Sequence, residues 1–285
     1  MVTENLYASF FGFSERPFNL VPDPDFLFWS KQHSGAYAVL EFGIMSRAPI
    51  TLLTGEIGSG KTTLVQKLLA SLRDDVTVGL VSNAQGGRGE LLQWVLNALG
   101  IRFGSNASYV EMFQKLQEFI IDEYAANRRV VLIIDEAQNL SIEGLEELRM
   151  LTNINSNKDE LIQLILVGQP ELKDLVLSPK MKQLAQRVAG SYHLGEMDQK
   201  TVGEYIEHRL KKSGGTGGEI TKSATKIIYE STNGVPRLVN QLCELCLLYA
   251  WGKEEKFVGI RTVRKVLSDG VFFGGHALHD REELM

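Results

Sequence analysis

The sequence lacks the features that mark disulfide-rich, secreted and membrane-spanning proteins. Its 285 residues include only two cysteines, Cys243 and Cys246, which are too few for a disulfide framework and fit a reducing compartment. No run of about 18 apolar residues occurs, so the sequence predicts no membrane-spanning helix. The N-terminus also lacks the basic and then apolar order of a signal peptide. We therefore expect a cytoplasmic protein, whose attachment to any membrane would come through a partner.

Positive charge is scarce as well. The formal net charge is −5 at pH 7 and the sequence pI is about 5.7, which disfavours a general polyanion-binding protein. The balance is uneven: it is −5 over residues 1–195, +3 over residues 196–268 and −3 over residues 269–285. Nucleic acid is therefore not the favoured partner, but the mildly basic segment keeps a local contact open.

Cys243 and Cys246 stand in Cys-x-x-Cys spacing, which is also found in metal and redox sites. Residues 242–248 follow an amphipathic helical pattern, and no second pair of cysteines or histidines lies close to them in the sequence. A free cysteine packs as a small hydrophobic residue. We therefore predict ordinary helix packing for both side chains.

Strands and helices alternate over residues 49–195. Five consecutive branched apolar residues, 130–134, suit a strand that is buried on both faces. Alternating strands and helices predict a parallel sheet with helical crossovers. The expected strands are 49–54, 76–82, 130–134, 161–167 and 191–194, and the expected helices are 61–72, 88–99, 110–126 and 140–153.

The pattern becomes purely helical over residues 196–270, with helices expected at 198–212, 222–231, 235–251 and 260–268. A glycine-rich stretch, 213–218, predicts a flexible loop within this part, and residues 271–285 predict a weakly ordered tail. The fold class is thus α/β, with a parallel-sheet core and a small C-terminal all-helical domain.

The first strand leads into a complete phosphate-loop pattern, Gly55-Glu56-Ile57-Gly58-Ser59-Gly60-Lys61-Thr62. Glycines let the backbone N–H groups turn toward phosphates, and the following helix adds its positive end. Lys61 is expected to reach the β- and γ-phosphates, and the Thr62 hydroxyl to bind Mg²⁺. The pattern therefore predicts ATP and Mg²⁺ as ligands.

Asp135 and Glu136 follow the buried strand 130–134, about 70 residues after the loop. We expect Asp135 to hold Mg²⁺ and Glu136 to orient and deprotonate the attacking water. Gln169 ends the next apolar strand, where it would position the same water, sense the γ-phosphate, or serve only as a turn residue before Pro170. Asn83 ends another strand, where restraint of Glu136 and plain loop hydrogen bonding stay equally open.

Two arginines are candidates for stabilising the charge that develops at the γ-phosphate. Arg237 begins a helix of the C-terminal domain and would act within its own chain, while Arg187, near the end of the helical stretch 181–188, is better placed to reach a neighbouring subunit's nucleotide. Surface salt bridging is the alternative for both.

Aromatic residues and prolines gather near the N-terminus. Residues 5–30 contain Trp29, Pro17, Pro22 and Pro24 together with several phenylalanines, and proline interrupts regular elements. We predict that residues 1–48 form an extended arm and a first helix, near 31–46, packed on the core. The arm either packs as plain structure or walls a nucleotide base. His33, which follows the arm, would either contact the base or pack as a half-buried histidine, and packing is the favoured alternative.

These features together resemble the ExeA-like branch of the AAA+ ATPases, also called general secretion pathway protein A. The similarity runs from about residue 10 to about residue 267 and is much more specific than the phosphate loop alone. Its marks are Phe10–Phe13, Arg16–Phe18, Pro22–Pro24, Leu53–Thr63, Asp135–Leu140, Leu148–Asn153, Val167–Leu172, Gln186–Val188 and Gly234–Arg237.

The resemblance implies that Gln169 is the sensor 1 residue, Arg187 the arginine finger and Arg237 the sensor 2 arginine. We also expect Thr63, the last residue of the matching motif, to bind the nucleotide. It also implies a homo-oligomeric ring or partial ring with ATP at subunit interfaces. Family members carry a membrane span and a peptidoglycan-binding domain after the ATPase, and serve a secretin pore. Because neither follows here, we expect a truncated piece or a stand-alone relative with an envelope or inner-membrane protein partner.

Three functions compete at this stage. The first is an ATPase that drives assembly or operation of an envelope machine for secretion, pili or exopolysaccharide export. The second is an ATP-gated DNA-binding adaptor of the transposition or replication-helper type, which the +3 balance of residues 196–268 keeps open. The third, a nucleotide-binding scaffold without turnover, is disfavoured by the presence of Glu136, Arg187 and Arg237.

Overall fold

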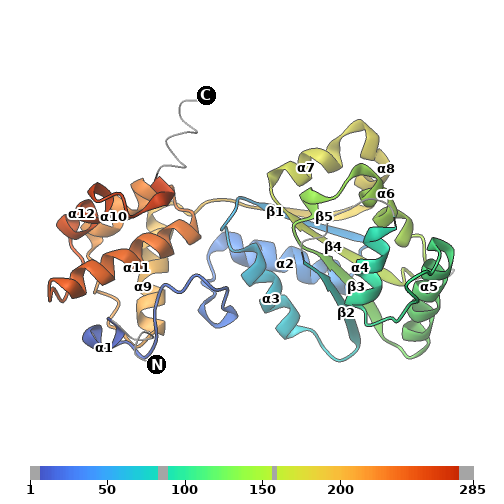
Figure 1. Ribbon diagram of the computed structural model, residues 1–285, viewed down its shortest axis with the longest axis horizontal. Coiled ribbons are helices and arrows are strands. Elements are labelled where there is room, and N and C mark those ends of the chain that lie inside the picture. Colours follow the sequence, from blue (N-terminus) through green and yellow to red (C-terminus); the bar gives the residue numbers. More distant parts are fainter. Residues whose placement is uncertain (1–6, 83–88, 156–158, 276–285) are drawn as a thin grey trace. The chain divides into compact units, whose positions relative to one another are not determined.

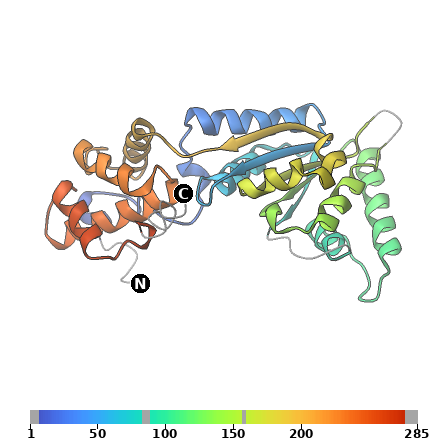
Figure 2. The same ribbon diagram turned by 90° about the horizontal axis from the view of Figure 1, so that it is seen from above.

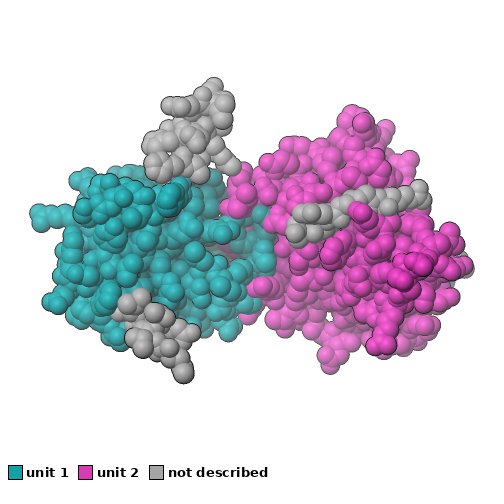
Figure 3. All heavy atoms as spheres, in the orientation of Figure 1, with its two compact units in different colours: residues 1–30, 58–63, 195–285 teal, residues 31–57, 64–194 magenta. Residues whose placement is uncertain are grey.

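The chain divides into two compact units, which Figure 3 shows in different colours. The computed structural model describes residues 7–82, 89–155 and 159–275. Unit 1 contains residues 1–30, 58–63 and 195–285, and unit 2 contains residues 31–57 and 64–194. The division places the residues of the phosphate loop from Gly58 onward with the helical part of the chain.

Unit 2 is built on a sheet with helices on both faces (Figure 1). The strands are β1 (Ile50–Gly55), β2 (Val76–Val81), β3 (Arg129–Ile134), β4 (Ile162–Gly168) and β5 (Val188–Leu194). The helices are α2 (Lys31–Met45), α3 (Lys61–Ser71), α4 (Glu90–Ala98), α5 (Tyr109–Ala125), α6 (Ile142–Leu151), α7 (Pro170–Leu177) and α8 (Lys182–Ala185), with 3-10 turns η2 (Ala137–Asn139) and η3 (Pro179–Met181).

The strand order is β2-β3-β4-β1-β5, and every neighbouring pair is parallel. The predicted parallel α/β sheet is therefore confirmed. Because all strands run the same way, their carboxyl ends share one edge of the sheet, the edge where ligands bind in open α/β folds. The register pairs Ile134 of β3 with Leu166 of β4, and Thr54 of β1 with Gly168 of β4.

Each face of the sheet is covered, as the apolar run 130–134 predicts. Val130, Leu132 and Ile134 point into a core shared with α4 to α8. Val131 faces the other way and pairs with Gln163, whose amide donates to the Gly43 carbonyl of α2 at 3.0 Å. Figure 2 shows α2 along one side of the sheet, where it packs on β5 and β1.

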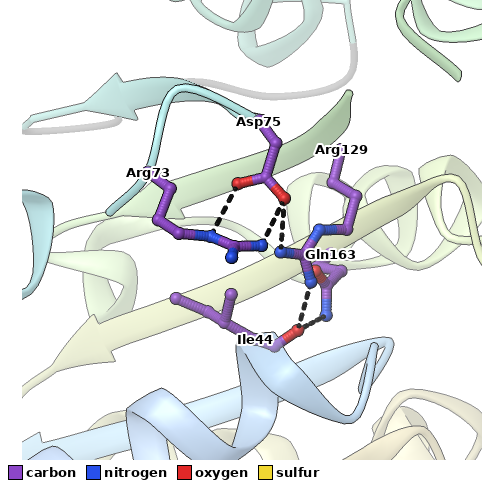
Figure 4. A network of polar contacts seen from close by, with 5 residues as sticks. All are labelled: Ile44, Arg73, Asp75, Arg129 and Gln163. Atoms are coloured by element: carbon purple, nitrogen blue, oxygen red, sulfur yellow. Dashed lines mark hydrogen bonds and ion pairs between the residues drawn. The ribbon is translucent and has the colours of Figure 1, made fainter. Parts of the chain in front are cut away.

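The amino edge of the sheet is closed by a polar network (Figure 4). Gln163 Nε2 and Arg129 Nη1 both donate to the Ile44 carbonyl, at 3.4 and 3.2 Å. Asp75 accepts from Arg129 and Arg73, at 3.4 and 2.8 Å. These donors satisfy carbonyls at the end of α2 that lack partners within the helix. A cavity of about 340 Å³ lies beside them, so it belongs to the edge opposite the strand carboxyl ends.

Unit 1 is helical, as expected for the C-terminal part. Its helices are α1 (Ala8–Phe11), α9 (Gln199–Lys212), α10 (Lys222–Thr232), α11 (Pro236–Gly252) and α12 (Ile260–Ser268), with 3-10 turns η1 (Pro24–Phe26) and η4 (Phe273–Gly275). Cys243 and Cys246 are fully buried and free, and burial raises the pKa of Cys246 to about 12. Their predicted role in helix packing is confirmed.

The packing of the N-terminal arm differs from the prediction. We predicted that residues 1–48 pack on the α/β core, but the described residues up to Ser30 belong to the helical unit, and only α2 belongs to unit 2. Phe13 and Phe18 lie in the core of unit 1, and the buried Arg209 donates to the Pro17 carbonyl at 2.5 Å. The phenylalanine rings are buried, as apolar side chains favour, but they pack on the helices of unit 1 and not on the sheet.

Four further details differ from the sequence analysis. The predicted weakly ordered tail begins too early, because Phe272 is buried against the helices and η4 follows it. The loop 213–218 is held by Glu219, which accepts from Thr216 N and Gly217 N at 2.6 and 3.0 Å. Strand β5 starts at Val188 rather than 191, and α7 was not predicted.

Within the described residues, no helix is apolar over enough length to cross a bilayer.

Candidate active site

The phosphate loop begins where β1 ends, at Gly55, and leads into α3 at Lys61. Gly58 and Gly60 have φ angles of 80° and 100°, a region that side-chain-bearing residues rarely adopt. Ser59 and Lys61 are buried. The remaining loop residues Glu56, Ile57, Thr62 and Thr63 are half-buried or exposed.

Within unit 1 the loop contacts the start of α11. The Arg237 backbone N–H donates to the Gly58 carbonyl at 3.2 Å, and a Cβ on Gly58 would lie 2.5 Å from Arg237 Cβ. Gly234, before α11, has φ 72°, and a Cβ there would lie 1.9 Å from the Met197 carbonyl oxygen. The tight turn brings the backbone of Arg237 to the loop, while its side chain is exposed.

Asp135 and Glu136 leave the end of β3. The Asp135 backbone N–H still donates to the Val81 carbonyl of β2 at 2.9 Å, which extends the strand pairing by one residue. Asp135 Oδ1 then accepts from the Glu136 N–H at 3.0 Å. Glu136 adopts a left-handed conformation with φ 55°, which turns the chain sharply into η2. Strained backbone of this kind is typical of functional sites.

Glu136 and Gln169 meet across the ends of β3 and β4. Gln169 Nε2 lies 3.5 Å from Glu136 Oε2, so two residues that the sequence analysis placed at the site are brought together. A third side chain, Gln138 of η2, donates to the same Glu136 oxygen at 2.5 Å and accepts from the Gln169 backbone N–H at 3.0 Å. No role for Gln138 is predicted from the sequence.

Arg187 lies between α8 and β5 and is held by the end of α6. Its Nη1 donates to the Thr152 carbonyl and hydroxyl oxygens at 3.0 and 2.6 Å, and its Nη2 donates to Asn153 Oδ1. These partners are neutral, and within the described part of the chain Arg187 forms no salt bridge. Thr152 and Asn153 are marks of the family resemblance, yet their contact with Arg187 does not follow from their sequence positions.

The remaining candidates are placed as follows. His33 is buried within α2, and Asn83 lies outside the described residues. Among the described residues, no group of three or more His, Cys, Asp or Glu side chains is arranged to hold a metal ion. Mg²⁺ is usually bound by one or two protein ligands together with water and phosphate oxygens.

The sheet order, the phosphate loop after β1 and the acidic pair after β3 are those of the P-loop fold of AAA+ proteins. Residues 44–176 match a family model described as an AAA domain. The chain is 34% identical over 248 residues to general secretion pathway protein A of Aeromonas hydrophila, covering 87% of this chain and 45% of that protein. The chain belongs to the AAA+ ATPases as an ExeA-like relative, and spans less than half of that relative's length.

Solved structures show the same fold. The ORC2 protein of Aeropyrum pernix, solved in ADPNP and ADP complexes, matches with a TM-score of 0.67 and 18% identity, covering 89% of this chain and 71% of that chain. Cdc6p of Pyrobaculum aerophilum matches with a TM-score of 0.66 and 19% identity, covering 93% and 71%. At these identities the similarity concerns the fold alone.

Proposed function

We propose that the chain binds Mg–ATP on residues 55–63 and hydrolyses it with Glu136 as the general base. The observation that carries the proposal is the meeting of Glu136 and Gln169, with Gln169 Nε2 3.5 Å from Glu136 Oε2. They meet at the sheet edge where β1, the neighbour of β4, leads into a complete phosphate loop.

The loop fits a phosphate-bearing ligand. Ser59 Oγ is buried and has no hydrogen-bond partner among the residues that the structure describes, and a buried hydroxyl of this kind calls for an acceptor such as a phosphate oxygen. Gly58 and Gly60 adopt positive φ angles and carry no side chains of their own, a backbone conformation that suits N–H groups turned toward an anion. Thr62 and Asp135 would hold Mg²⁺, which supplies neutralisation of phosphate charge when it is bound.

The side chains have distinct tasks in this proposal. Lys61 binds the β- and γ-phosphates, and the Glu136 carboxylate takes the proton of the attacking water. Gln169 orients the same water through its amide. Positioning and electrostatic stabilisation supply most of the rate enhancement in phosphoryl transfer, so the geometry of these groups matters more than their individual reactivity.

Two arginines complete the proposed machinery. Arg237 stabilises the γ-phosphate charge within the same chain, and its backbone contact with Gly58 supports this assignment. Arg187 acts on the nucleotide of a neighbouring subunit in a homo-oligomer, and its fixation by Thr152 and Asn153 supports a guanidinium that is held ready rather than left free to sample many rotamers.

The proposed biological role is to drive assembly or operation of a bacterial envelope machine for secretion, pili or exopolysaccharide export. It rests on the similarity to general secretion pathway protein A. The proposal includes an inner-membrane protein partner that recruits the cytoplasmic chain to the membrane. A second candidate, an ATP-gated DNA-binding adaptor, is favoured by one observation, the +3 charge balance of residues 196–268. Tight, salt-sensitive binding to duplex DNA would support it.

The central experiment measures phosphate release and ATP binding by the whole chain with Mg²⁺. Lys61→Ala should lose nucleotide binding or turnover, whereas Glu136→Gln should retain ATP binding and lose hydrolysis. Lys115→Ala and Glu118→Gln, at exposed positions of α5, are matched controls that should behave as the parent. Hydrolysis by Glu136→Gln at the parental rate would refute the assignment of the base.

A mixing experiment tests Arg187. Arg187→Ala subunits keep a complete loop and base, while Glu136→Gln subunits keep Arg187. If Arg187 acts across an interface, each variant alone is slow and a mixture regains part of the activity. A mixture no faster than its components would contradict action in trans.

A further inference from the structure

Gln138 bridges the ends of two neighbouring strands through a single amide. Its Nε2 donates to Glu136 Oε2 at 2.5 Å, and its Oε1 accepts from the Gln169 backbone N–H at 3.0 Å. Both halves of the amide are therefore used, and each is bound to a residue of the proposed hydrolytic site. The phosphate-loop pattern and the acidic pair do not include this residue.

The backbone around the amide is shaped to receive it. The left-handed turn at Glu136 starts η2, so that Gln138 is directed back toward the carboxylate two residues before it. On the β4 side stands Gly168, where a Cβ would lie 2.6 Å from Gln138 Oε1 and 2.7 Å from Leu172 Cδ2. Any larger residue at 168 would expel the amide, so the glycine leaves the space that the bridge occupies.

The bridge acts on one oxygen of the carboxylate. Both amide donors, Gln138 Nε2 and Gln169 Nε2, lie near Glu136 Oε2, which selects one rotamer of the glutamate and directs Oε1 away from the bridge. A glutamate side chain loses rotamer entropy when it is fixed. The amide supplies this fixation before the reaction, and a base that is displaced by about 1 Å can lose on the order of a hundredfold in rate.

We propose that Gln138 is a positioning residue for ATP hydrolysis: its amide holds the Glu136 carboxylate in register with Gln169. The proposal rests on the proposed function. Because Gln138 acts on the base and not on the nucleotide, its loss should lower kcat and leave the affinity for ATP unchanged. The same amide ties the end of β3 to the end of β4, so movement of either strand end is transmitted to the base.

Two substitutions separate the two halves of the amide. Gln138→Ala removes both bonds. Gln138→Glu has the same shape and keeps an oxygen that accepts from the Gln169 N–H, but it replaces the donor with a second carboxylate that repels Glu136. If Gln138 positions the base, both variants lower kcat, by about tenfold to a hundredfold, with ATP Kd within about twofold of the parent. If the amide serves only to link the strand ends, Gln138→Ala keeps the parental kcat, and the proposal fails.

The experiment also includes Glu136→Gln, the double variant Glu136→Gln/Gln138→Ala, and Gln93→Glu, at an exposed position of α4, as a matched control. Under the proposal, Gln138→Ala adds no further loss of residual rate once Glu136 is Gln, because its effect passes through that carboxylate. An additional tenfold loss in the double variant would overturn the proposal. If Glu136→Gln itself hydrolyses ATP like the parent, the proposed function fails; if it is inactive while both single Gln138 variants remain at the parental rate, only the role of Gln138 fails.

Discussion

Gly58→Ala offers a sharp test of the phosphate-loop geometry, because a methyl group there meets two separate obstacles. Gly58 is one of the variable positions of the phosphate-loop pattern, so the motif itself does not require glycine there. The structure does require glycine at position 58, because φ is 80° there and a Cβ would lie 2.5 Å from Arg237 Cβ. That neighbouring atom is bonded directly to the backbone of α11, so it cannot rotate away.

The two obstacles contribute separately to the expected loss of stability. A left-handed conformation costs an alanine about 1–2 kcal/mol. Overpacking of a close contact costs about 1–3 kcal/mol more. We therefore expect Gly58→Ala to lower the free energy of unfolding by about 2–5 kcal/mol, and to weaken ATP binding because the loop must deform.

Two glycines of the same chain provide matched controls. Gly100 has φ 71°, and a methyl group added there would have nothing within 4 Å, so Gly100→Ala carries the conformational cost alone. Gly104 has neither a left-handed φ nor a close neighbour, so Gly104→Ala should be almost neutral. Urea unfolding followed by circular dichroism gives the free energies, and titration calorimetry gives the Kd for ATP.

The decisive comparison is between Gly58→Ala and Gly100→Ala. If the contact with Arg237 exists in solution, the first variant is less stable than the second by the overpacking cost, and only the first loses affinity for ATP. Equal stability of the two variants, together with an unchanged Kd for ATP, would refute the close approach of α11 to the loop.

Three further predictions concern the scaffold. Gln163→Ala should lower the free energy of unfolding by about 2–4 kcal/mol in urea titrations, because the Ile44 and Gly43 carbonyls lose a buried donor; a neutral effect would contradict the network. The Arg128 guanidinium lowers the pKa of Glu123 below 4.5, so Glu123→Gln should have a lower Tm than the parent at pH 7. This difference in Tm should shrink as the pH falls below 4.5 and disappear once the pH is below the lowered pKa of Glu123. A difference in Tm that does not depend on pH would exclude charge as its source. Burial raises the pKa of Cys246 to about 12, so iodoacetamide should modify it slowly at pH 8 and rapidly in urea, as mass spectrometry would show.

Much of the fold could be predicted from the sequence because its local signals agree with one another. The branched apolar run 130–134 predicts a strand covered on both faces, and β3 has that environment. Ser141 is a plausible helix N-cap from its sequence position, and its hydroxyl accepts from the Gly144 N–H at the start of α6. A phosphate loop between a strand and a helix then places the site at the carboxyl edge of a parallel sheet.

The wrong predictions concern segments whose packing partners the sequence does not identify. Phe13 and Phe18 predict a packed arm, yet aromatic rings are equally compatible with the sheet unit and with the helices that bury them. Phe272 falls in the predicted weakly ordered tail because the surrounding glycines obscure one buried ring. Glu219 holds the glycine-rich loop through its backbone N–H groups, and composition alone does not predict such a partner.

The same distinction applies within the site. Motifs identify the side chains proposed to touch ATP, because the chemistry of phosphate and Mg²⁺ dictates their types. They do not identify the side chains that orient these residues, because orientation depends on which strand ends become neighbours. Gln138 contacts Gln169 only because β3 and β4 are adjacent in the sheet, and Thr152 contacts Arg187 only because α6 ends beside the turn into β5. An amide that closely follows an acidic pair can therefore be interpreted as a positioning residue only once the sheet order is known. Substitutions of orienting residues such as Gln138 and Thr152 should lower the rate of turnover before they weaken the binding of nucleotide.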